Sequence, residues 1–222
     1  KSRSRGLGDV YKRQGIDITM FMSDMSLNEN LSSTPQDRRE LMDLVERMQG
    51  AFTTIAKSKI PTIALAHGFC IGGATSLVSA CDIRLATKDA KFSIGETKLG
   101  LVADVGVIQR MPKIVSSGDM NELALTGRIF DGEHAEKIRF VSKVYENSDD
   151  LFEAGEKLAN EISSNSKRIV QATKEALEKS SNLTVDQGLE YAKLWSTSFL
   201  VSEDLREGVM AFLEKRDPKF NE

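Results

Sequence analysis

The part of this sequence that most constrains the fold is HGFCIGGATSLVSACDIR, at residues 67–84. The apolar run at 60–67 (IPTIALAH) leads into it and is typical of a buried strand. The Gly72–Gly73 pair then opens GATSLVSA, which we expect to form a short buried helix at 73–80, and CDIRLAT at 81–87 predicts the next strand. Strand, glycine-rich turn, helix and strand in close succession indicate an α/β fold.

The flanking segments extend this pattern. KFSIG at 91–95 predicts a third short strand and FVSKVY at 140–145 a last one, while Thr34 and Pro35 are typical of the start of a helix that runs to about Lys57. Apolar residues at helical spacing predict four C-terminal helices, and we therefore expect an α/β core over 15–145 and a helical segment over 146–222. The four expected helices cover 149–163, 167–179, 185–200 and 203–215.

The Gly72–Gly73 turn suggests chemistry as well as structure. Glycine lacks a Cβ atom, so a ligand can approach the backbone closely. The following helix N-terminus offers free N–H groups and partial positive charge, which suits a phosphate or a developing oxyanion. The sequence has neither a Walker loop nor a GxGxxG motif here. The alternative interpretation is close packing between a strand and a helix.

Two carboxylates stand in an otherwise apolar, glycine-rich stretch at 92–112, namely Glu96 and Asp104. Apolar surroundings desolvate a carboxyl group and raise its pKa, so two such groups can divide the roles of general base and general acid. Structural alternatives exist for both. Asp104 would cap a helix at 105–111, and Glu96 would cap the short turn before Gly100.

Composition excludes several other classes. The only cysteines are Cys70 and Cys81 and the only histidines His67 and His134, so we expect neither a disulfide scaffold, nor a structural zinc site, nor another metal centre. No stretch approaches the roughly 20 apolar residues of a membrane-spanning helix. Residues 1–14 hold five basic residues and one acidic residue, and the remainder has 25 basic and 32 acidic residues, so nucleic acid is not an expected partner.

Taken together, GID at 15–17, HGFCIGG with ACDIR, FSIGETKLGLVADVG and the ending FLEKRDPKF resemble the enoyl-CoA hydratase/isomerase (crotonase) superfamily. The spacing of Glu96 and Asp104 most resembles the Δ3,5-Δ2,4-dienoyl-CoA isomerase branch. The resemblance implies a spiral of ββα units with a C-terminal helical segment that mediates trimerisation. It also implies an acyl-CoA thioester substrate, with no cofactor besides the CoA of the substrate, a homotrimer or hexamer, and a role in fatty-acid β-oxidation.

The resemblance also implies roles for residues. Asp104 would remove a proton from C2 of a 3,5-dienoyl-CoA and Glu96 would protonate C6, while the backbone N–H groups of Ile16 and Gly73 would form the oxyanion hole. Phe212 and Lys215 are possible CoA contacts, although the favoured interpretation is an amphipathic packing helix with a solvated lysine. Substrate-binding positions carried over from the family are Gly15, Asp17, Gly72, Ala74 and Ser76.

Two departures from the family pattern matter. Ser76 stands where the family has an acid, which counts against water addition because a hydroxyl is not a carboxylate base near neutral pH. The β-rich stretch that precedes GID in the family is missing, and KSRSRGLGDVYKRQ (1–14) is interpreted as a non-native leader joined to an N-terminally truncated chain. The leader's other interpretations are a nuclear-type basic patch or part of a transit peptide.

The alternatives are a Δ3-Δ2-enoyl-CoA isomerase that uses Glu96 alone, a hydratase-like enzyme, and a non-catalytic member that binds CoA or RNA. We expect a protein without a membrane span, cytoplasmic or, in a eukaryote, mitochondrial or peroxisomal.

Overall fold

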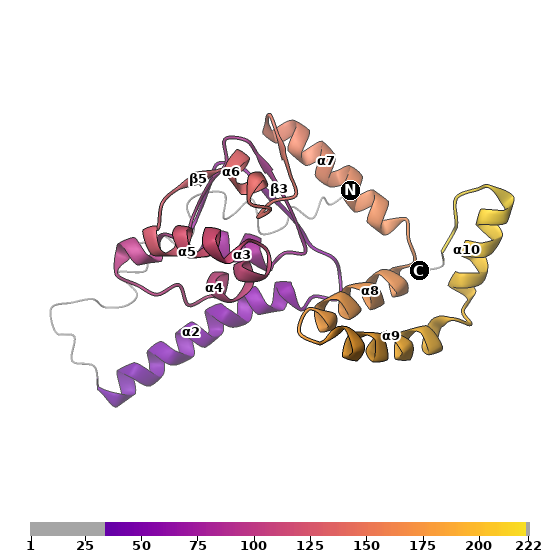
Figure 1. The fold of residues 1–222 in the computed structure, drawn as a ribbon, viewed down its shortest axis with the longest axis horizontal. Helices are drawn as coiled ribbons and strands as arrows, with labels where there is room; N and C mark the ends of the chain where they lie inside the picture. The colour runs from indigo at the N-terminus through magenta and orange to yellow at the C-terminus, as the bar shows by residue number, and fades with distance from the viewer. Residues whose placement is uncertain (1–33, 221–222) are drawn as a thin grey trace. The chain divides into compact units, whose positions relative to one another are not determined.

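The computed structural model describes residues 34–220, and within them the chain divides into two compact units. Unit 1 holds residues 34–57 and 62–153, and unit 2 holds residues 58–61 and 154–220. Figure 1 follows the chain from α2 in indigo to α10 in yellow. The predicted segments 15–145 and 146–222, and the interpretation of 1–14 as a leader, stay predictions.

Unit 1 contains two small sheets. In the first, β1 (Ile63–Ala66), β3 (Ile83–Thr87) and β6 (Lys143–Tyr145) are parallel, with β3 in the middle. The second has β4 (Lys91–Ser93) in the middle, parallel to β2 (Phe69–Ile71) and antiparallel to β5 (Phe130–Asp131). The predicted α/β class is confirmed.

The helix α3 (Gly73–Ala80) lies between β2 and β3 in the sequence and begins and ends at the predicted residues. The strand β2 was missed, because Gly68 and Gly72 flank only three residues and the segment was interpreted as a turn. Both glycines have positive φ, 66° and 57°, so the chain bends sharply at each end of β2.

The core of unit 1 contains three phenylalanines, one from β4, one from β5 and one from the segment between α6 and β6. Phe92 of β4 stacks on Phe130 of β5 with ring centroids 5.5 Å apart, and Phe140 meets Phe92 edge-on at 5.4 Å. Phe92 and Phe140 are fully buried, together with Val107 and Met111. These contacts fix the ends of β4 and β5, and β4 leads directly into the candidate site.

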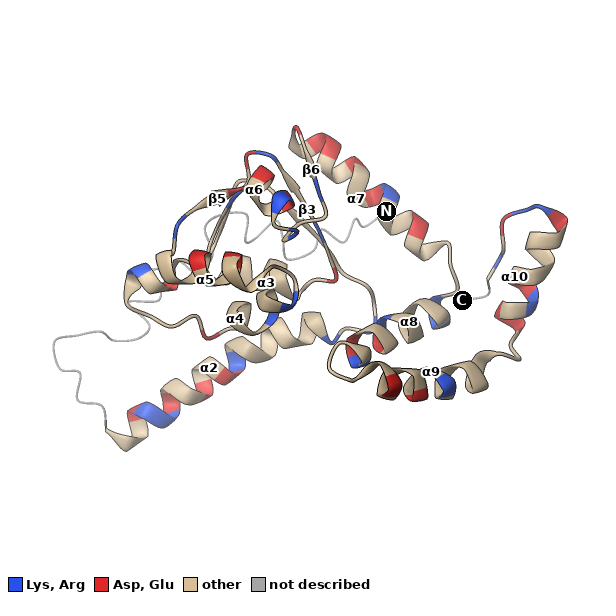
Figure 2. Cartoon of the chain, in the orientation of Figure 1, with Lys and Arg blue, Asp and Glu red and all other residues tan. Residues whose placement is uncertain are grey.

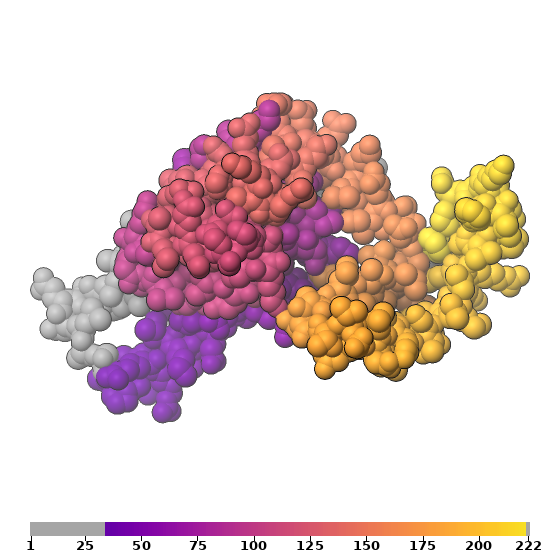
Figure 3. All heavy atoms as spheres, viewed as in Figure 1, coloured from indigo at the N-terminus to yellow at the C-terminus, as the bar shows by residue number. Residues whose placement is uncertain are grey.

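The helix α2 (Pro35–Ala56) begins with the predicted cap. The Thr34 hydroxyl accepts the N–H of Asp37, and the Asp37 carboxylate accepts the N–H of Thr34, which makes a capping box. No residue of α2 is fully buried. The first turns are exposed and stand clear of the rest of unit 1 (Figure 3), whereas the second half packs beside α3 (Figure 1).

Short helical elements complete unit 1. The 3-10 turn η2 (Gly95–Leu99) follows β4, and α4 (Val107–Arg110) runs into η3 (Met111–Lys113). The helix α5 (Ser117–Thr126) precedes β5, and α6 (Gly132–Lys137) has Asp131 as its N-cap.

Four longer helices follow: α7 (Ser148–Ser163), α8 (Lys167–Ser180), α9 (Val185–Phe199) and α10 (Glu203–Glu214). Thr184 and Gln187 form a capping box at the start of α9, and Ser202 caps α10. Basic and acidic side chains alternate along these helices without a continuous basic strip (Figure 2). Among the described residues, none of the helices is long and apolar enough to cross a membrane.

Candidate active site

The turn between β2 and α3 forms the first part of the site. Gly72 has φ 57° and ψ −116°, a conformation that side-chain-bearing L-residues rarely adopt. Its N–H donates to the Ser93 carbonyl over 2.9 Å, and the buried Thr75 hydroxyl donates to the same carbonyl over 3.0 Å. The end of β4 therefore fixes the start of α3.

Gly73 is the first residue of α3, so its N–H has no acceptor within the helix. The helix start predicted from the glycine pair is confirmed. The other proposed oxyanion donor, Ile16, lies outside the described residues, as do Gly15 and Asp17. The pairing of the two donors therefore stays a prediction.

Glu96 brings a carboxylate to this turn. It lies in η2, directly after β4, and its Oε1 is 3.3 Å from the point that a Cβ on Gly72 would occupy. Its Oε2 is buried and has no hydrogen-bond partner among the described residues. The expectation that Glu96 caps the turn is wrong, because Ile94 is the N-cap of η2. The carboxylate instead points at the backbone that precedes the Gly73 N–H.

The environment of Glu96 raises its pKa. Burial is the largest cause, and the charge of Asp104 adds to it, while a hydrogen bond from the backbone N–H of Glu96 itself opposes them. Glu96 therefore holds its proton closer to neutral pH than an exposed glutamate. The contribution of Asp104 means that the two carboxylates interact through space.

Asp104 is exposed and lies on an irregular segment between η2 and α4. The expectation that Asp104 caps a helix at 105–111 is wrong, since α4 begins at Val107 and its N-cap is Gly106, with φ 116°. Two residues that the sequence did not single out, Gln49 and Arg110, donate hydrogen bonds to backbone carbonyls of this segment. Helical periodicity placed Gln49 on α2, but no local signal reveals a partner 55 residues away.

Ser76 lies one turn into α3. Its side chain is fully buried, and its Oγ has no hydrogen-bond partner among residues 34–220. Its N–H donates to the Gly72 carbonyl over 3.1 Å, and Ala74 on the same turn is half-buried. The position where the family has an acid therefore offers an unpaired neutral hydroxyl.

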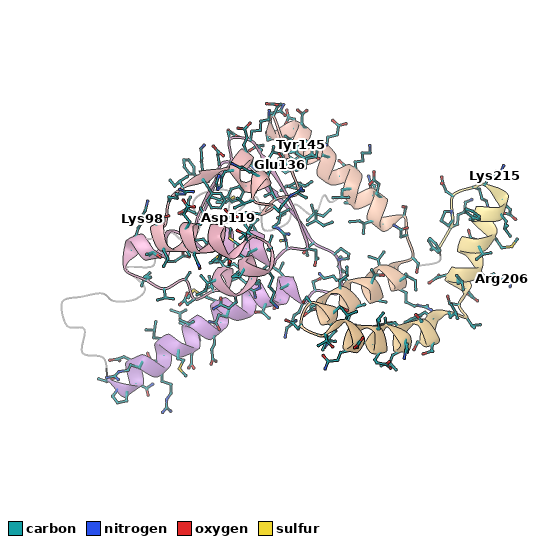
Figure 4. All side chains as sticks on the ribbon, in the orientation of Figure 1. Lys98, Asp119, Glu136, Tyr145, Arg206 and Lys215 are labelled. Carbon is teal, nitrogen blue, oxygen red and sulfur yellow. The ribbon has the colours of Figure 1, made fainter. Side chains whose placement is uncertain are left out.

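The segment that links Glu96 and Asp104 carries exposed apolar side chains. Leu99, Leu101 and Val102 are all exposed, and Val102 has 77% of its surface accessible. Lys98 precedes them on η2 and is also exposed (Figure 4). The segment between η2 and α4 therefore offers apolar surface for a ligand beside Glu96 and Asp104.

The remaining predicted residues lie in unit 2. Phe212 on α10 has 82% of its surface exposed, and Lys215 follows the helix with φ 54° (Figure 4). Their role as CoA contacts stays a prediction. In unit 1, His67 packs edge-on against Phe152 at 5.6 Å, and burial raises the pKa of the Cys70 thiol to about 11.

An α/β unit in which a glycine-opened helix faces a half-buried carboxylate places free N–H groups beside a group that can exchange protons. The chain belongs to the enoyl-CoA hydratase/isomerase family, whose model matches residues 19–222.

Curated relatives and solved structures agree with this membership. The chain is 47% identical to the mitochondrial Δ(3,5)-Δ(2,4)-dienoyl-CoA isomerase of Dictyostelium discoideum, over 85% of this chain and 64% of that protein. It is 39% identical to the peroxisomal Δ(3,5)-Δ(2,4)-dienoyl-CoA isomerase of Arabidopsis thaliana, over 93% and 74%. The crystal structure of a putative enoyl-CoA hydratase/isomerase family protein from Hyphomonas neptunium matches with a TM-score of 0.79 and 32% identity, covering 94% of this chain and 75% of that one.

Proposed function

We propose that this chain belongs to an isomerase that converts a 3,5-dienoyl-CoA into the 2,4-dienoyl-CoA. The observation that carries the proposal is the half-buried carboxylate of Glu96 against the Gly72 turn, with Asp104 close enough to raise the pKa of Glu96. The names of the relatives from Dictyostelium and Arabidopsis support the same reaction.

In the proposed mechanism, Asp104 takes a proton from C2 of the substrate. The C–H electron pair then delocalises over both double bonds and the thioester carbonyl, so that the carbonyl oxygen becomes the oxyanion of an extended trienolate. The N–H of Gly73, at the start of α3, is the donor available to that oxygen within the described residues. Removing one donor of this kind typically raises the barrier by about 3–4 kcal/mol.

Glu96 then delivers a proton to C6. The 2,4-diene forms as the electron pair returns to carbon. Asp104 then releases its proton to solvent, and Glu96 takes one up from solvent. Burial and the nearby Asp104 charge favour the protonated form of Glu96, as a general acid requires. The surroundings of the two acids agree with these roles. Asp104 is exposed, as suits an ionised base, and Glu96 is half-buried, as suits a protonated acid.

Ser76 supports isomerisation over hydration. Adding water across a 2-enoyl thioester takes two acid–base groups on opposite sides of one water, and Ser76 supplies no carboxylate. A Δ3-Δ2 isomerase with Glu96 as its single acid would tolerate the loss of Asp104. A non-catalytic CoA-binding member would bind the thioester without turnover.

The surroundings support an acyl substrate and an assembled protein. Leu99, Leu101 and Val102 offer apolar surface beside the acids. Exposed apolar side chains on the C-terminal helices, among them Leu189 and Leu194 on α9, support assembly of copies into a trimer or hexamer. The two isomerase relatives above carry a mitochondrial and a peroxisomal name, so they favour an organelle without selecting one.

The test is an absorbance assay on the full-length gene product, with 3,5-dienoyl-CoA, 3-enoyl-CoA and 2-enoyl-CoA as separate substrates. We expect a conjugated 2,4-dienoyl thioester to appear only from the first. Asp104→Asn and Glu96→Gln should each abolish its formation, whereas Asp89→Asn, a change at an exposed turn, should not. Turnover of 3-enoyl-CoA by Asp104→Asn would instead favour the single-acid isomerase, and binding without any turnover the non-catalytic member.

A further inference from the structure

The position of the Asp104 carboxylate depends on an irregular stretch of backbone. Residues 101–106 belong to no helix or strand, so no regular hydrogen-bond ladder holds them. Two consecutive carbonyls of this stretch, those of Asp104 and Val105, instead accept hydrogen bonds from side chains of other elements.

The first of these bonds comes from α2. The side-chain amide of Gln49 donates to the Asp104 carbonyl over 2.7 Å. Thr53 lies one helical turn further along α2, so Gln49 and Thr53 share the face that meets this stretch. Both residues lie in the second half of α2, which packs beside α3.

The second bond comes from α4. Arg110 donates to the Val105 carbonyl over 3.3 Å and to the Thr53 hydroxyl over 3.2 Å. Its guanidinium folds back over Gly106, and a Cβ at that glycine would lie only 1.8 Å from the Arg110 Nη1. Gly106 therefore makes room for an arginine that ties the segment to α2.

We propose that Gln49 is a positioning residue for Asp104, with Arg110 as the second anchor of the same segment. The inference rests on the proposed function, in which Asp104 is the base. Gln49 bonds to the carbonyl of Asp104 itself, so it fixes the backbone from which the reacting carboxylate extends. A positioning error of about 1 Å at a reacting group is enough to cost up to about 100-fold in rate.

The test compares Gln49→Met and Gln49→Glu with a matched control, Gln36→Met. Methionine keeps the approximate shape of glutamine without the donor, and an ionised glutamate also lacks the donor and repels the carbonyl. Gln36 lies on the exposed first turns of α2, and its side-chain amide donates to Glu40 in the same helix. We expect kcat with 3,5-dienoyl-CoA to fall about 10-fold in both Gln49 variants, with KM unchanged within about two-fold, and no change in Gln36→Met.

The pH profile of kcat gives a readout that a purely structural role would not move. The Asp104 charge helps to raise the pKa of Glu96, so an Asp104 that drifts away should move the alkaline limb to lower pH. Wild-type kcat and pH profile in Gln49→Met, with an inactive Asp104→Asn variant, would overturn the positioning role and leave the proposed function standing. Full activity in Asp104→Asn would overturn both.

Discussion

Replacing Gly72 by alanine tests whether the turn at α3 and the Glu96 carboxylate form one site. The φ of 57° with ψ −116° is strained for an L-residue, which costs about 1–3 kcal/mol of stability. For a protein of this size, each kcal/mol lowers the melting midpoint by roughly 2–4 °C. The added Cβ would also stand 3.3 Å from Glu96 Oε1, so the carboxylate must shift by a few tenths of an ångström.

The activity of the folded Gly72→Ala protein should therefore fall about 10-fold in the dienoyl-CoA assay, beyond the loss of stability seen by thermal melting. Gly68→Ala is the matched control, because Gly68 also has a positive φ, 66°, but no atom of residues 34–220 lies within 4 Å of its added Cβ. It should lose stability and keep its activity. Equal activity of the two variants per folded molecule would refute the proposed link between the Gly72 turn and the role of Glu96 as the acid.

Three further results are expected. Gly132→Ala should destabilise the protein by about 3 kcal/mol or more in urea unfolding, because its Cβ would meet the backbone carbonyl oxygen of Thr87 at 2.0 Å; a loss below about 1 kcal/mol would contradict this close approach. Glu207 has a pKa lowered to about 2 by hydrogen bonds from Arg216 and a backbone N–H, against an ordinary value of 4.5. The hydrogen bonds that hold residues 216–219 to α10 should thus be complete above about pH 4.5 and be lost as the pH falls toward 2. Amide protection factors in this segment that stay constant across that range would be inconsistent with this loss. Cys70 on β2 is buried and its pKa is raised to about 11, so a thiol reagent at pH 8 should leave it unmodified in the native protein. Rapid labelling would show that the structure around β2 opens.

Much of the fold was predictable because its signals are local. Thr34 caps a helix where the sequence indicated one, and Asp131 and Thr184 cap helices in the same way, since a capping side chain acts within three residues of its own position. The strand β2 was not predicted, because three residues are too few to show an alternating pattern. A strand this short is defined by its partner β4, which lies 20 residues further along.

In the candidate site, too, the local features were predictable and the contacts between distant residues were not. The Gly72–Gly73 helix start follows from local conformation, and the acids stand out against their apolar neighbours. Their structural alternatives as caps failed, because packing against Gly72 positions Glu96 and side chains from α2 and α4 hold the backbone at Asp104. Contacts between residues far apart in sequence leave no trace in periodicity.

The proposed assignment of Asp104 as the base and Glu96 as the acid can be tested by hydrogen exchange at C2 of 3,5-dienoyl-CoA in D₂O. The full-length gene product with Glu96→Gln should still exchange the C2 hydrogen, since Asp104 can remove and return it, yet form no 2,4-dienoyl product. Asp104→Asn should show neither exchange nor product. Exchange that survives in Asp104→Asn and disappears in Glu96→Gln would contradict the assignment and make Glu96 the base.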